Sequence, residues 1–119
     1  MRVQINTDGT IEGHEKMFDQ IGYSVNSALE RTSARITRVE VHLSNVTGRK
    51  RGQINSRCVL EARLEGRQPF AVTHHATTLA QAVDGAANKL SRLVERNVDR
   101  MHHQRARRTD PPLSEPEIM

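Results

Sequence analysis

Residues 36–44 read Ile-Thr-Arg-Val-Glu-Val-His-Leu-Ser, and polar and apolar side chains alternate from Arg38 to Ser44. Successive side chains of an extended strand point to opposite faces, so Val39, Val41 and Leu43 share one face. The polar positions between them are Arg38, Glu40 and His42. The stretch therefore predicts a strand with one buried face and one open face.

The alternation recurs in three other stretches of the chain. Residues 57–64 and 70–75 each predict a strand, and Glu65-Gly66 between them supplies turn residues. Residues 2–6 predict a short first strand. The segment 45–55 has two glycines around three consecutive basic residues and no periodicity, so it is predicted to be a flexible hairpin loop.

Two segments have helical periodicity instead. Between residues 13 and 31, apolar side chains lie three and four positions apart, which predicts a helix ending near Thr32-Ser33. Thr77 or Thr78 is expected to cap a second helix, whose apolar face continues for about six turns. That apolar face consists of Leu79, Val83, Ala86, Leu90, Leu93, Val94 and Met101.

The resulting order, β-α-β-β-β-α, predicts an α+β domain over residues 1–104. Two helices accompany four strands, so we expect both helices to pack on one face of a four-stranded sheet. The other face is then left for solvent or a partner. Residues 105–119 contain three prolines and are predicted to form a disordered tail.

Composition excludes several classes of function. The 119 residues hold 18 Lys and Arg against 14 Asp and Glu, a net charge of +4. No apolar run reaches the roughly 18 residues of a membrane span, and the N-terminus lacks the apolar block of a signal peptide, so we expect a cytoplasmic protein without membrane contact. Trp is absent and aromatic residues are few, which disfavours modules that stack RNA bases on rows of rings.

Catalysis and metal binding are not expected. Cys58 falls on a predicted buried face, so it reads as a structural thiol rather than a nucleophile. The six histidines lack the spacing of metal ligands, and no phosphate loop, catalytic triad or pair of carboxylates is recognisable. The sequence therefore predicts neither an enzyme nor a cofactor, metal or small-molecule substrate.

Positive charge is concentrated on the second predicted helix. Seven basic and two acidic residues lie between Lys89 and Arg108. Their spacing of three and four aligns a basic ridge beside the apolar face, consisting of Lys89, Arg92, Arg96, Arg100 and His103. Such a ridge can follow a phosphate backbone, although a solvated helix face is the alternative. The open sheet face adds Arg38, Arg57 and Arg63. Glu40 and Glu61 lie among these arginines, so cross-strand ion pairs explain the alternation of charge equally well.

Three stretches resemble a known family. They are Ile36 to Leu43, Leu64-Glu-Gly-Arg-Gln68, and Ala82-Val-Asp-Gly-Ala-Ala-Asn-Lys-Leu90 followed by the basic helix. Together with the element order, they resemble the short form of the ribosome hibernation-promoting factor and ribosome-associated inhibitor A family, over residues 1 to about 103.

The resemblance implies a fold like the double-stranded-RNA-binding domain and a non-enzymatic translation inhibitor. Such a factor sits in the decoding channel of the small ribosomal subunit in stationary phase or stress, contacts rRNA, and sterically blocks mRNA and tRNA. The implied rRNA contacts are Lys89, Arg92, Arg96 and Arg100, with Arg38, Arg57, Arg63 and Arg67 on and near the sheet. The separate C-terminal dimerisation domain of long members has no counterpart here, so direct pairing of ribosomes through it is not expected. A stable obligate homo-oligomer is not expected either.

Two other interpretations stay open at this point. The domain could be a general double-stranded-RNA-binding module, which excess duplex RNA would titrate away from ribosomes. It could also be a protein-interaction module that does not bind ribosomes, recruiting a partner through its open sheet edge or tail.

Overall fold

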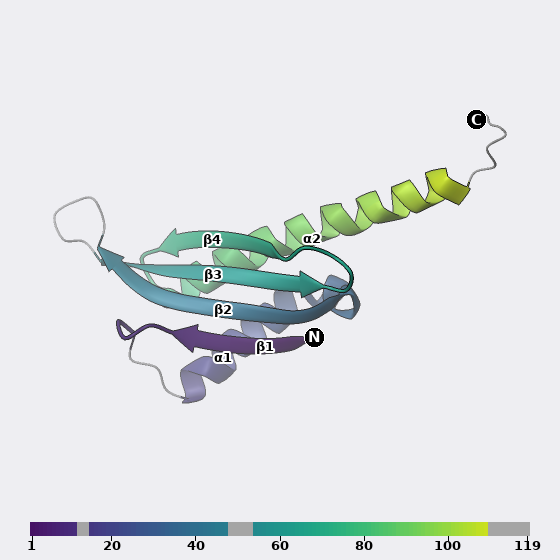
Figure 1. Cartoon of the computed structure of the whole chain (residues 1–119). Coiled ribbons are helices and arrows are strands. Elements are labelled where there is room, and N and C mark those ends of the chain that lie inside the picture. Colours follow the sequence, from purple (N-terminus) through teal and green to yellow (C-terminus); the bar gives the residue numbers. More distant parts are fainter. Residues whose placement is uncertain (12–14, 48–53, 110–119) are drawn as a thin grey trace.

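The computed structural model describes residues 1–11, 15–47 and 54–109, and it has the predicted element order (Figure 1). The elements are strand β1 (Arg2–Thr7), helix α1 (Glu15–Ala28), the short 3-10 helix η1 (Glu30–Arg35), strands β2 (Ile36–Thr47), β3 (Ile54–Leu64) and β4 (Phe70–Ala76), and helix α2 (Leu79–Thr109).

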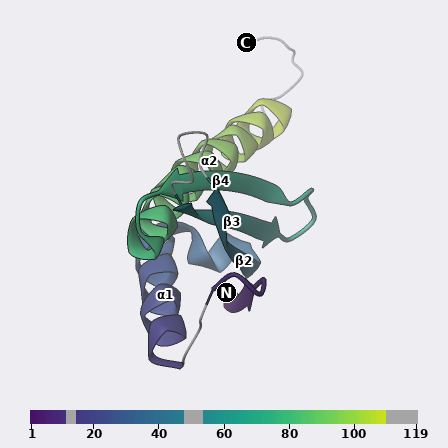
Figure 2. The ribbon, with the colours of Figure 1, turned by 90° about the vertical axis from the view of Figure 1, so that its left-hand side faces the viewer.

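The four strands form one mixed sheet in the order β1-β2-β3-β4. β1 runs parallel to β2, because α1 and η1 cross over between them, and the other two pairs are antiparallel. Figure 2 shows α1 and α2 on the same side of the sheet. The prediction of two helices on one face and an open opposite face is therefore confirmed.

The core lies between the helices and the inner face of the sheet. Val39, Val41 and Leu43 of β2 are buried there, as the alternation predicts. The other fully buried large side chains include Val25, Leu29, Leu60, Val83, Leu90 and Val94. Cys58 is also buried, and desolvation raises the pKa of its thiol to about 12, so the thiol stays protonated at neutral pH.

The β2–β3 hairpin is longer than the sequence predicts. Asn45 pairs with Ser56 and Val46 with Asn55, so the prediction of a loop over 45–55 is wrong at both ends. Hydrogen bonds of polar residues, rather than buried apolar side chains, accompany the strands here. The Asn45 backbone N–H donates to Thr10 Oγ1 at 2.8 Å, and Ser56 Oγ donates to the Asn45 side-chain oxygen at 3.3 Å. Residues 48–53, which hold the three consecutive basic residues, lie outside the described part of the chain.

Both helices differ in length from their predictions. The first is described from Glu15 and ends at Ala28, and η1 follows, where Ser33 Oγ donates to the Glu30 carbonyl at 3.0 Å. Such back-bonding by hydroxyl groups suits short tight turns. α2 continues to Thr109, so residues 105–109 are helical rather than part of the predicted tail. Arg and Ala favour helix there, and the first proline comes only at Pro111. Residues 110–119 lie outside the described residues, as do residues 13 and 14.

Thr78 caps α2, one of the two positions that the sequence predicts. Its Oγ1 accepts the backbone N–H of Gln81 at 3.2 Å. We expect Thr78→Ala to lower the free energy of unfolding by about 1 kcal/mol, because this N–H loses its acceptor. Urea unfolding of the two proteins measures the difference, with Thr78→Ser as the control that keeps the oxygen. Equal losses in both variants would contradict the cap.

Candidate nucleic-acid interface

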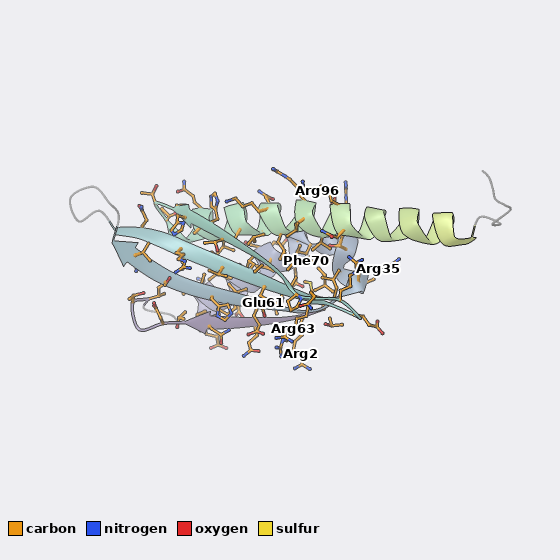
Figure 3. All side chains as sticks on the ribbon, turned by 45° about the horizontal axis from the view of Figure 1, so that its top comes forward. Arg2, Arg35, Glu61, Arg63, Phe70 and Arg96 are labelled. Atoms are coloured by element: carbon orange, nitrogen blue, oxygen red, sulfur yellow. The ribbon has the colours of Figure 1, made fainter. Side chains whose placement is uncertain are left out.

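The basic ridge lies on the part of α2 that the sheet leaves uncovered. α2 buries Val83, Leu90 and Val94 against the core, which turns Arg92 and Arg96 to solvent. Figure 3 shows Arg96 pointing away from the body of the protein. Arg100 and His103 lie on the same helix, but their side chains are outside the described part.

Few interactions neutralise the ridge. Arg96 Nε donates to the Arg92 carbonyl at 3.4 Å, a long bond that leaves the other guanidinium donors available. Within the described residues, no carboxylate pairs with Arg92 or Arg96, although Glu95 lies on the same helix. The exposed guanidinium groups can therefore meet phosphates without first breaking an ion pair.

Lys89 has a structural contact that the spacing does not reveal. Its Nζ donates to the backbone carbonyl of Thr73 on β4 at 3.1 Å. β4 forms one edge of the sheet, so this contact ties α2 to the backbone of an edge strand. Lys89 remains exposed and can still offer its other N–H groups to a ligand.

The open sheet face carries both basic and acidic side chains, and they form ion pairs. Arg63–Glu40 crosses from β3 to β2 as the cross-strand interpretation expects, whereas Arg38–Glu40 and Arg63–Glu61 each lie within one strand. Glu40 accepts from Arg38 Nη2 at 2.7 Å and lies 4.0 Å from Arg63 Nε. Arg63 Nη2 also lies 3.7 Å from Glu61. Two of the predicted sheet contacts, Arg38 and Arg63, are thus partly neutralised by carboxylates of the same face.

Arg57 and Arg67 lie apart from these ion pairs. Arg57 borders a shallow hollow of about 370 Å³ at the far end of the open face, together with Asn6, Asp8 and His42. Arg67 is exposed in the β3–β4 turn, where Gly66 has a positive φ of 72° and the Arg67 N–H donates to the Leu64 carbonyl at 3.2 Å. Neither arginine has an ion pair in the described residues.

The predicted contacts therefore form two separate surfaces rather than one. The helix positions lie on α2, and the sheet positions lie on or near the opposite, open face. Arg2 is a basic residue that the prediction missed. The register places it directly beside Arg38, and its parallel pairing joins segments 36 residues apart, so no local pattern in the sequence shows it.

Two other observations bear on the kind of site. No group of three His, Cys, Asp or Glu that could hold a metal ion exists among residues 1–11, 15–46 and 55–97, whose side chains the structure describes. No helix in the same part of the chain is long and apolar enough to cross a membrane.

Comparisons with known proteins place the chain in a family. Residues 4–102 match the family model of the Sigma 54 modulation protein / S30EA ribosomal protein. The chain belongs to this family. Its sequence resemblance to ribosome hibernation-promoting factors is thereby confirmed. A search of the curated proteins found no significant match.

Solved structures have the same fold. A ribosomal subunit interface protein from Coxiella burnetii is similar at a TM-score of 0.68 and 10% sequence identity, covering 83% of this chain and 99% of that one. The Thermus thermophilus Protein Y N-terminal domain is similar at a TM-score of 0.60 and 21% identity, covering 80% of this chain and 93% of that one. At these identities the likeness concerns the fold alone.

Proposed function

We propose that this protein is a ribosome-associated translation inhibitor that binds the small ribosomal subunit in the cytoplasm and catalyses no reaction. The observation that carries the proposal is the exposed pair Arg92 and Arg96, free of carboxylate partners in the described residues, on a long helix. Family membership and the printed name of the Coxiella burnetii relative support a ribosomal partner.

The proposed mechanism is electrostatic attachment followed by steric exclusion. α2 has 31 residues, which corresponds to about 46 Å of helix, long enough to follow several phosphates of rRNA. The domain then occupies the decoding channel during stationary phase or stress, and its volume keeps mRNA and tRNA out. No chemical step is needed.

The proposed rRNA contacts differ in how ready they are to bind. Arg92 and Arg96 are exposed and without carboxylate partners, and Arg100 extends their spacing along α2. Lys89 can contact a phosphate through its remaining N–H groups while one of them donates to the Thr73 carbonyl. Arg57 and Arg67 are exposed, whereas Arg38 and Arg63 must share their donors with Glu40 and Glu61.

Co-sedimentation with small ribosomal subunits over a salt series tests the proposal. Each phosphate contact releases counterions, so four contacts predict a loss of affinity of about 100-fold between about 50 and 200 mM salt. Excess duplex RNA serves as the competitor. A ribosome factor should stay bound, whereas release by the duplex would indicate a general double-stranded-RNA-binding module.

Failure to sediment at low salt would contradict the proposal. It would favour the remaining alternative, a domain that kept the family's fold and binds a protein partner instead.

A further inference from the structure

Three arginines from three adjacent strands lie side by side at one end of the open face. Arg2 of β1 pairs with Arg38 of β2, which pairs in turn with Arg63 of β3. Residues opposite each other in a sheet have Cα atoms only about 4.5–5.5 Å apart, so the three side chains share one small area. Figure 3 shows the side chains of Arg2 and Arg63 close together.

The three side chains border a hollow. It has a volume of about 310 Å³ and is lined by Arg2, Thr37, Arg38 and Arg63. Thr37 Oγ1 already donates to the Arg63 carbonyl at 3.0 Å, so the guanidinium groups are the donors that remain for a ligand. We call Arg2, Arg38 and Arg63 the arginine cluster.

The arginine cluster has more positive charge than its neighbours neutralise. Glu40 contacts Arg38 and Arg63, and Glu61 contacts Arg63 alone. Arg2 has no ion pair within the described residues. Like charges directly opposite each other destabilise a sheet, so an anion in the hollow would remove a cost present in the free protein.

One nitrogen of Arg38 also lacks an acceptor. Its Nη2 donates to Glu40 at 2.7 Å, but its Nε is buried and has no hydrogen-bond partner. A buried N–H without an acceptor is unfavourable, and because Nε is screened from solvent a ligand in the hollow would meet the terminal nitrogens of Arg38 instead.

We propose that the arginine cluster binds a phosphate group, best one of a chain of linked phosphates. Several guanidinium groups around a small hollow suit a multiply charged oxyanion, because a guanidinium without a carboxylate partner, such as that of Arg2, can donate two parallel N–H···O bonds to phosphate oxygens. The ligand could come from a free polyphosphate or nucleotide, or from an RNA backbone. Arg38 and Arg63 are also among the proposed rRNA contacts, but the site lies on the opposite side of the sheet from α2. Its test uses isolated probes, so failure of this site and failure of ribosome binding can be told apart.

Thermal unfolding with inorganic tripolyphosphate at constant ionic strength tests the inference. At about ten times the dissociation constant, the anion should raise the Tm of the native protein by about 5 °C. Arg2→Gln and Arg63→Gln should each lose most of this shift. Arg31→Gln, which changes an exposed arginine of η1 that lies outside the arginine cluster, is the control and should keep it. Equal shifts in all four proteins, or no shift in the native protein, would overturn the proposal.

The Tm without tripolyphosphate gives a second signature of the arginine cluster. Arg2→Gln should leave this Tm unchanged or raise it, because it removes a like charge beside Arg38. Loss of the anion-induced shift therefore cannot be attributed to a misfolded variant. A large drop in Tm without the anion would mean that Arg2 serves the fold, and it would count against the site.

Glu40→Gln is expected to strengthen tripolyphosphate binding, the opposite of the effect of Arg2→Gln. Its carboxylate competes with the ligand for Arg38 and Arg63, so its neutralisation should tighten tripolyphosphate binding by about tenfold in a titration. Unchanged or weaker binding would contradict a phosphate site in which Glu40 is the internal competitor.

A single-stranded oligouridine without terminal phosphates identifies the source of the phosphate. If the ligand is RNA backbone, Arg2→Gln should weaken oligouridine binding by about fivefold, while Arg31→Gln has less effect. If it is a free polyphosphate, Arg2→Gln should affect tripolyphosphate alone. Equal weakening by Arg2→Gln and Arg31→Gln with both probes would indicate general attraction to a basic protein and would refute a defined site.

Discussion

Replacement of Arg92, Arg96 and Arg100 together by glutamate is expected to weaken binding to small ribosomal subunits by at least about 100-fold. Each substitution removes one proposed phosphate contact and puts a negative charge in its place, so attraction becomes repulsion along one face of α2. The logarithmic salt slope should fall by about 2 to 3, since each lost contact removes about 0.7–0.9. Co-sedimentation over the salt series measures both quantities.

The fold of this triple variant should be intact. Arg92 and Arg96 are exposed and lie away from the buried Leu90 and Val94, so the core is not altered. Far-UV circular dichroism and the Tm check this point. The matched control replaces the same three arginines by lysine, which keeps the charge but loses the fork of donors, and it should cost less than about tenfold. Native-like binding by the folded glutamate variant would exclude the ridge as the interface.

The ridge illustrates what helical spacing can and cannot predict. Positions three and four apart share a helix face in any sequence, and the exposure of Arg92 and Arg96 agrees with that rule. The contact of Lys89 with Thr73 was not predictable, because it depends on where an edge strand passes the helix. A charge stripe thus predicts the face but not which of its members already has a partner.

The sheet arginines show a similar limit. Alternation predicts correctly that Arg38 and Arg63 face away from the core, because it depends only on the two-residue period of a strand. Which side chains become neighbours depends on register. The parallel pairing of β1 with β2, which sets Arg2 beside Arg38, results from the crossover through α1 and η1 and has no local signal.

Element ends were the least predictable part of the fold. The strands of the β2–β3 hairpin continue through polar residues such as Asn45 and Ser56, whose side chains bond to each other and to Thr10. Hydrophobic periodicity cannot detect such pairs. The end of α2 was placed too early for a related reason: the apolar pattern stops where the helix leaves the core, whereas helix propensity continues to Thr109.

Gly85→Ala is expected to destabilise the protein, although alanine is the better helix former. Gly85 lies in α2 where the helix crosses β4, and the imidazole ring of His74 packs against its Cα. A Cβ at this position would overlap the ring, with His74 Cγ only 2.7 Å away and Cδ2 and Nε2 closer still. Relief requires the half-buried ring to leave its place or α2 to shift, so we expect a net loss of about 2 kcal/mol.

Gly22→Ala in α1 is the matched control. A Cβ there meets nothing within 4 Å, so the substitution should stabilise the protein by about 0.5–1 kcal/mol through helix propensity alone. Urea unfolding should therefore show that the same chemical change lowers the free energy of unfolding at Gly85 and raises it at Gly22. Stabilisation by both would mean that the His74 ring moves aside freely and that the contact does not position the helix.

A double-mutant cycle separates the steric cause from a general sensitivity of α2. His74→Ala removes the ring, so adding Gly85→Ala to that background should cost little or stabilise, which gives a coupling energy of about 2 kcal/mol. Additive effects would rule out the overlap. Lys89 holds the Thr73 carbonyl one helical turn beyond Gly85, next to His74 in the same strand. The close approach at Gly85 and the bond from Lys89 therefore fix α2 on β4 together, and this placement fixes the direction in which Arg92 and Arg96 face.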